Sequence, residues 1–427
     1  MNPLSIATRG KGVLGTLKRV NTIRKRYGFT ASNMDRLLSQ FAGILSQFNC
    51  GATFPITAAA LMRKNGIAHK YQARNIEFAV HGYFHIDHTL LPPERQFTYM
   101  DEAQQVLKLH GVSCSGFRSP YLRWNEDTLS AARQVGFLYD SSQGLAWDIV
   151  DEVTTEAYDR VLDFYGAVSA NRYPALPHLE NGLVRFPYCL PDDEALIERF
   201  HLMAVEPMNQ LWLAILAETY RLGELFTLGL HPERIDLCET ALCTTLRKAR
   251  ELSPPVWIAR LDEIARWWKA RLETVVTIDQ LEPGQFHICV NGPTGVSILT
   301  RGVELITPAT NWDGVYRRTA CAEVHLRADR RPLIGVSPSS APYLLSFLRQ
   351  QGYIVEFAED VHTHTLYLDR PHFRYEDERS LLAQIEGGDF PLVRLGRWPD
   401  GTHSALCVTG DIDALTIWDY SLRFLGR

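Results

Sequence analysis

The chain has 427 residues, of which 46% are hydrophobic and 22% charged, values typical of a globular protein with two or three domains. A net charge of -5 argues against a general nucleic-acid binder, because such proteins are basic. The eight cysteines are scattered without a C-x-x-C pair, which favours buried thiols in a reducing compartment over a disulfide framework. No secretory signal and no apolar span of about 18 residues is visible, so we expect a cytoplasmic protein.

The first 34 residues carry seven basic side chains, and no acidic residue precedes Asp35. Apolar residues recur among them at helical spacing, namely Leu14, Leu17, Val20 and Ile23. Such a basic amphipathic helix can lie on an anionic membrane, which makes peripheral membrane contact one interpretation. A solvated helix packed on the domain is the plainer one.

Strand and helix patterns alternate through the first two-thirds of the chain, which indicates an α/β architecture. Strands, several running into loops, are predicted at 50–57, 76–85, 114–121, 137–142, 182–190 and 223–234. Helices are predicted from Met34 to Leu45, at 100–111 and at 126–136, and a long closing helix is predicted at 236–272.

The pattern changes near residue 275, where short strands with two interspersed helices replace the alternation. Residues 404–413 then return to a long apolar strand that ends in two aspartates. We therefore predict three parts: a β/α domain over 1–274, an α+β domain of unknown role over 275–402, and a core strand over 403–427.

The strongest chemical signal is the motif HGYFH, with His81 and His85, followed closely by His88. Two imidazoles four residues apart can converge on one metal, although this spacing is common by chance and a histidine-rich loop explains His88 equally well. Asp413 is the candidate third ligand, because strands of a β/α barrel bring their C-terminal ends to one mouth. Asp411 shares its strand face and is a candidate base. Capping of the following helix accounts for one of the two aspartates but not for both.

These motifs resemble those of the polysaccharide deacetylases, carbohydrate esterases that remove N-acetyl groups from amino sugars. Asp411-Ile412-Asp413 and HGYFH resemble the D-x-D and HGY-x-H forms of the branch with peptidoglycan deacetylase-like and cyclic-imide-cleaving members. Arg118 in RSPY resembles the arginine motif of the family, and His231 in LGLH resembles its last histidine motif. Together these motifs are far more specific than any one of them.

The resemblance covers residues 20–272 and 403–427 and implies a distorted (β/α) barrel with an inserted α+β domain. In ordinary members the aspartate motif opens the domain, whereas here it comes last. This order implies a circular permutation that moved the first barrel strand to the C-terminus, which is tolerable because domain termini often lie close together.

The resemblance also implies a mechanism. His81, His85 and Asp413 would bind a divalent metal, expected to be Zn²⁺, that activates a water. Asp411 would act as the general base, and Arg118 would hold it ionised and oriented.

The remaining roles follow from the same resemblance. The backbone N–H of Tyr121 would stabilise the oxyanion, and His231 would protonate the departing amine. Either of two aspartates, Asp140 or Asp148, would orient His231. The residues assigned to the substrate pocket or its surroundings are Leu228, Leu230, Trp124, Trp147, Asp140 and Asp148. The plainer alternatives are a structural ion pair for Arg118, a core aromatic for Tyr121 and a helix-start residue for His231.

Three functions are compatible with these residues. The first is N-deacetylation of an amino sugar or sugar conjugate, the second hydrolysis of a cyclic imide or ureide, and the third non-catalytic glycan binding. Because no secretory signal is visible, a soluble or lipid-linked sugar precursor is a better substrate candidate than a mature wall polymer.

Overall fold

The computed structural model describes the chain in six segments, 23–24, 26–64, 66–148, 162–200, 205–319 and 321–423. Most of the basic N-terminal segment, with its predicted amphipathic helix, lies outside these residues. Arg26 is described and forms an ion pair with Glu198. Among the described helices, none is long and apolar enough to cross a membrane.

Seven strands close into a barrel whose pairings are all parallel. They are β1 (Ala52–Ile56), β2 (Ile76–Val80), β3 (Gly116–Phe117), β4 (Tyr139–Ala146), β7 (Leu183–Leu190), β8 (Leu225–Leu230) and β21 (Ser404–Gly410). The pairing of β4 with β7 closes the ring. The predicted (β/α) barrel is therefore confirmed. Three short strands extend its wall, β5 (Val168–Ser169), β6 (His178–Glu180) and β9 (Val256–Ile258).

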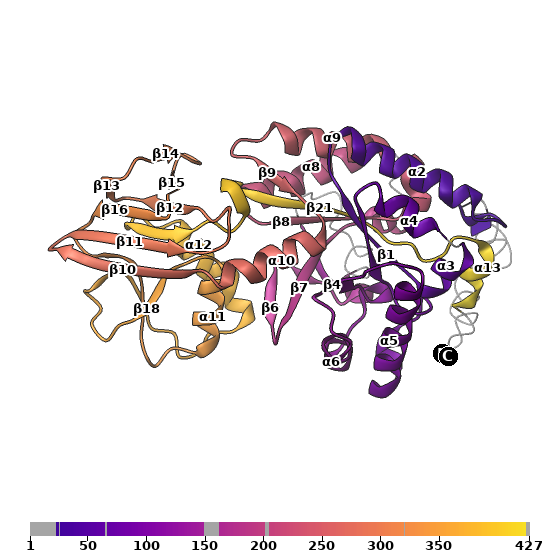
Figure 1. Ribbon diagram of the computed structural model, residues 1–427, viewed down its shortest axis with the longest axis horizontal. Coiled ribbons are helices and arrows are strands. Elements are labelled where there is room, and N and C mark those ends of the chain that lie inside the picture. The colour runs from indigo at the N-terminus through magenta and orange to yellow at the C-terminus, as the bar shows by residue number, and fades with distance from the viewer. Residues whose placement is uncertain are drawn as a thin grey trace.

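Amphipathic helices cover the outside of the barrel (Figure 1). They are α2 (Ser32–Gln47), α3 (Ala58–Arg63), α4 (Ile67–Gln72), α5 (Pro93–Leu109), α6 (Glu126–Val135), α8 (Val205–Arg221) and α9 (Ile235–Glu251). In α2, Met34, Leu37, Leu38, Phe41 and Leu45 are buried, at the three- and four-residue spacing that places side chains on one helix face. That face packs on the strands in the largest hydrophobic core of the molecule.

The last strand in the sequence, β21, lies inside the barrel wall between β1 and β8. Its register with β8 runs from Ala405 opposite Leu225 to Gly410 opposite Leu230, and all of its residues are buried. Successive side chains of a strand point to opposite faces, so Leu406 and the other even positions pack under the helices while Ala405 and the odd positions face the interior. The C-terminal segment is thus part of the core, and its aspartates emerge at the mouth of the barrel.

The predicted long helix at 236–272 is wrong. Helix α9 ends at Glu251, β9 follows, and α10 (Leu261–Leu272) is a separate helix. Pro254 and Pro255 lie in the interruption, and proline cannot donate the backbone hydrogen bond that a continuing helix needs. The freed segment instead pairs in parallel with β21, at Val256 to Ile258.

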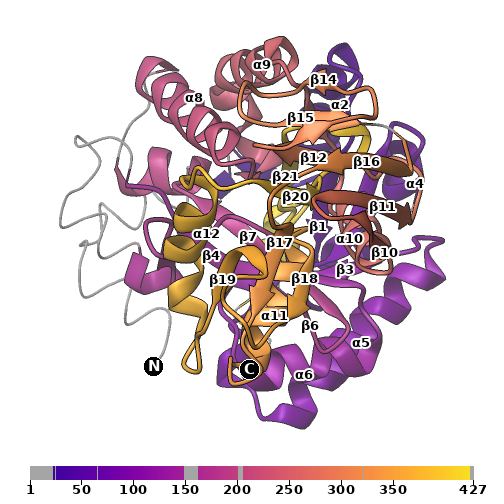
Figure 2. The same ribbon diagram turned by 90° about the vertical axis from the view of Figure 1, so that its left-hand side faces the viewer.

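After α10 the chain builds a second, smaller lobe from three small sheets and two helices, on the left of Figure 1 and facing the viewer in Figure 2. Its strands are β10 (Val275–Glu282), β11 (Gln285–Asn291), β12 (Ile298–Arg301), β13 (Glu304–Leu305), β14 (Thr310–Asn311), β15 (Arg317–Thr319), β16 (Glu323–Arg327), β17 (Arg331–Val336), β18 (Val355–Phe357), β19 (His364–Leu368) and β20 (Leu392–Leu395). Its helices are α11 (Pro342–Gln350) and α12 (Glu378–Glu386). Buried residues of α10, α11 and the barrel interior share one hydrophobic cluster, so the lobe is packed on the barrel.

Candidate metal centre and active site

Three potential metal ligands meet where β2 and β21 end. His81 directly follows β2, His85 lies four residues later in a tight loop, and Asp413 lies just beyond β21. Oδ1 of Asp413 is 3.5 Å from Nε2 of His81 and 3.3 Å from Nε2 of His85. The three donor atoms lie within 4.8 Å of one another, so one ion can contact all three. The structure therefore brings together the ligand set expected from the sequence.

The loop between the two histidines depends on Gly82, which has a positive φ of 81° that side-chain-bearing residues rarely adopt. A Cβ at this position would come within 2.9 Å of Nε2 of His88. His88 is fully buried beneath the loop, so the interpretation as a loop-surface histidine is wrong. Burial lowers the pKa of His88 to about 4, and the residue is not one of the three clustered ligands.

Hydrogen bonding and burial position the candidate ligand atoms. Nδ1 of His81 donates to the carbonyl oxygen of Arg118 at 2.9 Å, and Nε2 of the same ring faces Asp413. Burial lowers the pKa of His85 well below its ordinary value, so its imidazole is neutral. Burial alone would raise the pKa of Asp413, but the neighbouring imidazoles and the Arg423 guanidinium hold it well below its usual range.

Buried polar atoms without hydrogen-bond partners test whether these residues fit a metal ion. Oδ1 of Asp413 and Nδ1 of His85 are buried and have no hydrogen-bond partner among the described residues. A buried carboxylate oxygen without a donor is costly, and a cation between it and the imidazoles would remove that cost. The residues present therefore fit a bound divalent ion.

Asp411 lies beside this trio and is held by Arg118. Nη1 of Arg118 donates to Oδ1 of Asp411 at 2.5 Å, and the other carboxylate oxygen is 4.0 Å from Nε2 of His81. Arg118 is completely buried, and it also donates to Oγ1 of Thr409 and Oγ of Ser141, both at 3.0 Å. Its guanidinium thus has a fixed position inside the barrel, and it fixes the carboxylate in turn.

On another side of the mouth, His231 follows β8 and contacts Asp193 rather than either aspartate expected from the sequence. Nδ1 of His231 donates to Oδ1 of Asp193 at 2.7 Å, and its backbone N–H donates to Oδ2 at 2.8 Å. Burial opposes the charged imidazole, but the Asp193 carboxylate outweighs burial and raises the pKa of His231 well above its ordinary value. His231 is therefore held protonated near neutral pH.

The two sequence candidates for this contact lie elsewhere. Asp140 is buried on β4, accepts a hydrogen bond from Ser142 and pairs with Arg185 at 3.7 Å. Asp148 is exposed. The signal that could have identified Asp193 is the run Pro-Asp-Asp-Glu at 191–194, three consecutive acids directly after a buried strand.

A small cavity of about 30 Å³ connects these groups. Its lining residues are His81, His85, Tyr121, Leu122, Tyr165, Tyr188, Asp192, Glu194, His231 and Asp411. Of these, Leu122, Tyr165, Tyr188, Asp192 and Glu194 were not expected from the sequence. Burial and the adjacent Asp193 raise the pKa of Asp192 to about 6, and its carboxylate accepts a 2.8 Å hydrogen bond from Tyr188.

Tyr121 has a strained backbone at the edge of this cavity. Its φ is 59°, a left-handed conformation that costs a non-glycine residue of order 1 kcal/mol and clusters at functional sites. The ring of Tyr121 meets the ring of His85 with centroids 4.3 Å apart.

The remaining pocket residues expected from the sequence do not line this cavity. Leu228 and Leu230 share the outward face of β8 and pack in the core beneath the helices, because strand alternation turns them away from the side that carries His231. Trp124 packs against the guanidinium of Arg185, 3.9 Å from the ring centroid. Trp147 and Asp148 line a different cavity, between the barrel and the second lobe.

The protein is a closed parallel (β/α) barrel whose mouth carries two imidazoles and a carboxylate. Residues 27–139 match the family model of the polysaccharide deacetylases. This match confirms the resemblance inferred from the motifs for this part of the chain.

Individual relatives are distant. The peptidoglycan deacetylase-like protein FGM2 of Gibberella zeae is 35% identical over 91 residues, which are 21% of this chain and 24% of that protein. A Mycobacterium smegmatis structure assigned as a polysaccharide deacetylase is 21% identical, with a TM-score of 0.45 over 63% of this chain and 88% of its own. The PuuE allantoinase structure is 20% identical, with a TM-score of 0.44 over 55% of this chain and 72% of its own.

Proposed function

We propose that this chain is a hydrolase that removes an N-acyl group, in the simplest case acetyl, from an amino sugar or sugar conjugate. The observation that carries the proposal is a base and an acid, each held by its own buried partner, that line one cavity beside a set of three metal ligands. The polysaccharide deacetylase match over residues 27–139 supports acyl removal as the reaction.

His81, His85 and Asp413 would hold a divalent ion, because two imidazoles and one carboxylate are a common donor set for catalytic zinc. When bound there, such an ion lowers the pKa of a water and polarises a carbonyl oxygen. The trio therefore prepares the site for attack on an amide.

Asp411 takes a proton from the attacking water. Arg118 holds this carboxylate in a fixed position beside the cavity through its 2.5 Å hydrogen bond. We assign the backbone N–H of Tyr121 to the developing oxyanion, because its left-handed turn places this segment at the cavity edge.

His231 gives a proton to the departing nitrogen. An amine leaves poorly as an anion, so amide cleavage needs a protonated acid at this point. Asp193 keeps His231 in that protonated form, as the raised pKa of the imidazole indicates. A base that is ionised and an acid that is protonated at the same pH are the pair that this reaction requires.

The proposal is tested by assaying the Zn²⁺-loaded full chain against N-acetylated sugars, including lipid-linked ones, and against cyclic imides. We expect release of acetate from one or more N-acetyl sugars. Turnover of cyclic imides alone would overturn the deacetylase assignment while keeping a C–N hydrolase, and inactivity on both panels with metal bound would favour a glycan-binding barrel.

Two neighbouring aspartates offer a matched pair of variants for the same assay. Asp411→Asn should keep about one metal ion per chain and lose activity at least ~100-fold, the scale of a lost general base. Asp413→Asn should lose the ion itself. Metal content measured by elemental analysis separates the two, and loss of the ion from Asp411→Asn would exchange their roles.

We also infer that the barrel is circularly permuted. Strand β21 comes last in the sequence yet lies between β1 and β8. Segments near the two ends of the described chain meet: the N–H of Ile417 donates to the carbonyl of Gly28 at 2.9 Å, and the rings of Tyr27 and Tyr420 lie 5.1 Å apart. Domain termini that lie close together allow a strand to move from one terminus to the other.

A further inference from the structure

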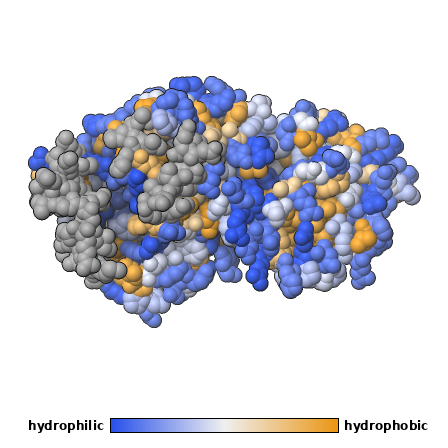
Figure 3. All heavy atoms as spheres, turned by 180° about the vertical axis from the view of Figure 1, so that it is seen from behind, coloured by the Kyte–Doolittle hydropathy of each residue, from blue (hydrophilic) through white to orange (hydrophobic). Residues whose placement is uncertain are grey.

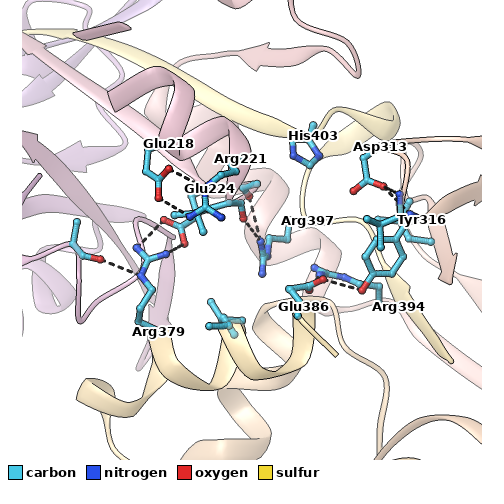
Figure 4. A pocket seen from close by; sticks show the side chains of 18 of the residues that line it. Glu218, Arg221, Glu224, Asp313, Tyr316, Arg379, Glu386, Arg394, Arg397 and His403 are labelled. Atoms are coloured by element: carbon cyan, nitrogen blue, oxygen red, sulfur yellow. Dashed lines mark hydrogen bonds and ion pairs between the residues drawn. The ribbon is translucent and has the colours of Figure 1, made fainter. Parts of the chain in front are cut away.

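A second cavity, of about 810 Å³, lies between the barrel and the second lobe. One wall comes from the beginning of β8 and β21, including Glu224 and His403, and the other from α12, β12 and β20 (Figure 4). His403 precedes β21 and Asp411 follows it, so roughly 25 Å of strand, at about 3.3 Å per residue, separates this wall from the catalytic cavity. The two cavities are therefore distinct. Seen from behind, hydrophilic side chains gather at the junction of the lobes (Figure 3).

The charged side chains that line the second cavity are almost all neutralised by one another. Three of its four arginines are paired with carboxylates of the cavity lining: Arg221 with Glu218, Arg379 with Glu224, and Arg394 with Glu386. The two remaining acids are exposed. Asp313 accepts the backbone N–H groups of Val315 and Tyr316, and Asp148 lies beyond the end of β4.

Arg397 is the exception. It is only 7% exposed, and no carboxylate pairs with it within the described part of the chain. Its Nη1 donates to the carbonyl oxygens of Leu222 and Gly223, at 2.9 and 3.4 Å, while its Nε is buried without a hydrogen-bond partner. Figure 4 shows this guanidinium inside the cavity, between the residues of the barrel and those of the second lobe.

Two other buried guanidiniums increase the positive charge around Arg397. Burial and the neighbouring charges of Arg394 and Arg397 lower the pKa of Arg271 to about 9, and burial and Arg394 lower the pKa of Arg397. Across the described residues, Glu386 is the one carboxylate that pairs with any of the three. A buried cation without a paired counter-ion is unfavourable, so the arrangement carries excess positive charge that an anion would offset.

We propose that Arg397 binds the oxyanion group, phosphate or carboxylate, of a small organic ligand held between the barrel and the second lobe. A guanidinium presents its donors in a planar fork that matches both oxyanions. The cavity volume lies in the usual range for small-molecule sites, about 300 to 1,000 Å³, and leaves room for more than the anion. Trp312, Tyr316 and His403 supply aromatic surface for the rest of the ligand.

Calorimetric titration of the full chain tests this proposal with three probes that share one hexose ring. Glucose 6-phosphate carries a phosphate, glucuronate a carboxylate, and glucose neither. We expect saturable binding of at least one anionic probe and none of glucose, and the better anion identifies the group. Equal binding of glucose, or no heat from either anion at millimolar concentration, would overturn the proposal.

Matched variants locate the binding. Arg397→Gln should lower the affinity for the anionic probe by at least about tenfold, which is the effect of losing a charge-assisted hydrogen bond. Arg221→Gln changes an exposed arginine that is already paired, so it should leave the affinity unchanged. Since loss of a buried arginine can disturb folding, a second pair uses Ala383, an exposed wall residue of α12. Ala383→Asp should lower the affinity for the anionic probe more than Ala383→Asn does, because only the aspartate adds a charge that repels the anion. Unchanged affinity in Arg397→Gln, or equal effects of the Ala383 pair, would refute the assignment.

Discussion

A buried imidazole normally loses its proton, and the contact between His231 and Asp193 reverses that tendency. Burial alone would lower the pKa of His231, yet the 2.7 Å hydrogen bond to an adjacent carboxylate raises it well above its ordinary value. At the metal trio, burial acts on His85 in the expected direction and leaves it neutral. The pKa values of these two histidines of one cavity shift in opposite directions, because Asp193 hydrogen-bonds His231 while burial and nearby cationic side chains outweigh Asp413 at His85.

Asp193→Asn tests this assignment through the pH profile. The active form of a general acid is protonated, so activity falls as the pH rises through its pKa. Without the carboxylate, burial remains and the pKa of His231 should fall, which moves the alkaline limb of kcat/KM to lower pH. Asp148→Asn, at an exposed aspartate outside the cavity, is the control and should leave the profile unchanged. An unaltered alkaline limb in Asp193→Asn would remove His231 from the role of acid.

At the scale of elements, β21 connects the fold to the chemistry. It pairs with β8 over six residue pairs and with β9 over three, and its contact with β1 completes the wall. The interruption of the predicted helix at 236–272 has the same cause, because the segment after Pro255 is drawn into pairing with β21. A strand that is buried on both faces and carries two site aspartates at its end cannot be a dispensable tail.

Deleting residues 403–427 should therefore abolish folding. The truncated chain would expose the edges of β1 and β8 together with their apolar faces, which favours aggregation. We expect insoluble protein, or a state that binds a hydrophobic dye and lacks near-ultraviolet circular dichroism. A chain that ends at Arg423 keeps every contact described above and serves as the control. A soluble and active 1–402 fragment would contradict the placement of β21.

At the scale of the whole molecule, the two ends of the described chain touch while the second lobe occupies the link between α10 and β21. The contact between Ile417 and Gly28 brings the C-terminal helix α13 (Ile417–Leu422) against the segment that precedes α2. The lobe enters after Leu272 and leaves before Ser404, at the opposite end of the barrel from the site aspartates. Its insertion therefore leaves the mouth of the barrel undisturbed.

A rearranged chain tests the inferred permutation. It would begin with residues 403–427, continue directly into residues 1–402, and so place the aspartate strand first. Because residues 27–28 contact residues 417–420, we expect the same circular dichroism spectrum, the same metal content and activity within a fewfold of the original. The control moves the termini into β8, between Thr227 and Leu228, where a break interrupts the barrel wall and should prevent folding. If the rearranged chain does not fold while the original chain does, the result would argue against permutation.

The sequence alone predicted the barrel class and the candidate metal ligands, because short motifs such as HGYFH and Asp411-Ile412-Asp413 carry their chemistry locally. It also indicated the strand that ends in the two aspartates, since a long apolar run followed by acids marks a buried strand. Which strand ends meet is a property of barrel closure, and the pairing of β21 with β8 and β1 became visible only in the tertiary structure.

Tertiary contacts also decide which residue pairs with His231 and which residues line the cavity, so the sequence did not identify them. Asp193 reaches His231 because β7 and β8 are neighbours, although 38 positions separate the two residues in the chain. Leu228 and Leu230 are apolar and close to His231 in sequence, but the strand alternation that buries them also turns them away from the cavity. The cavity around Arg397 combines side chains of two lobes. Local sequence determines what a side chain can do, and the closed barrel and its packed lobe decide what it meets.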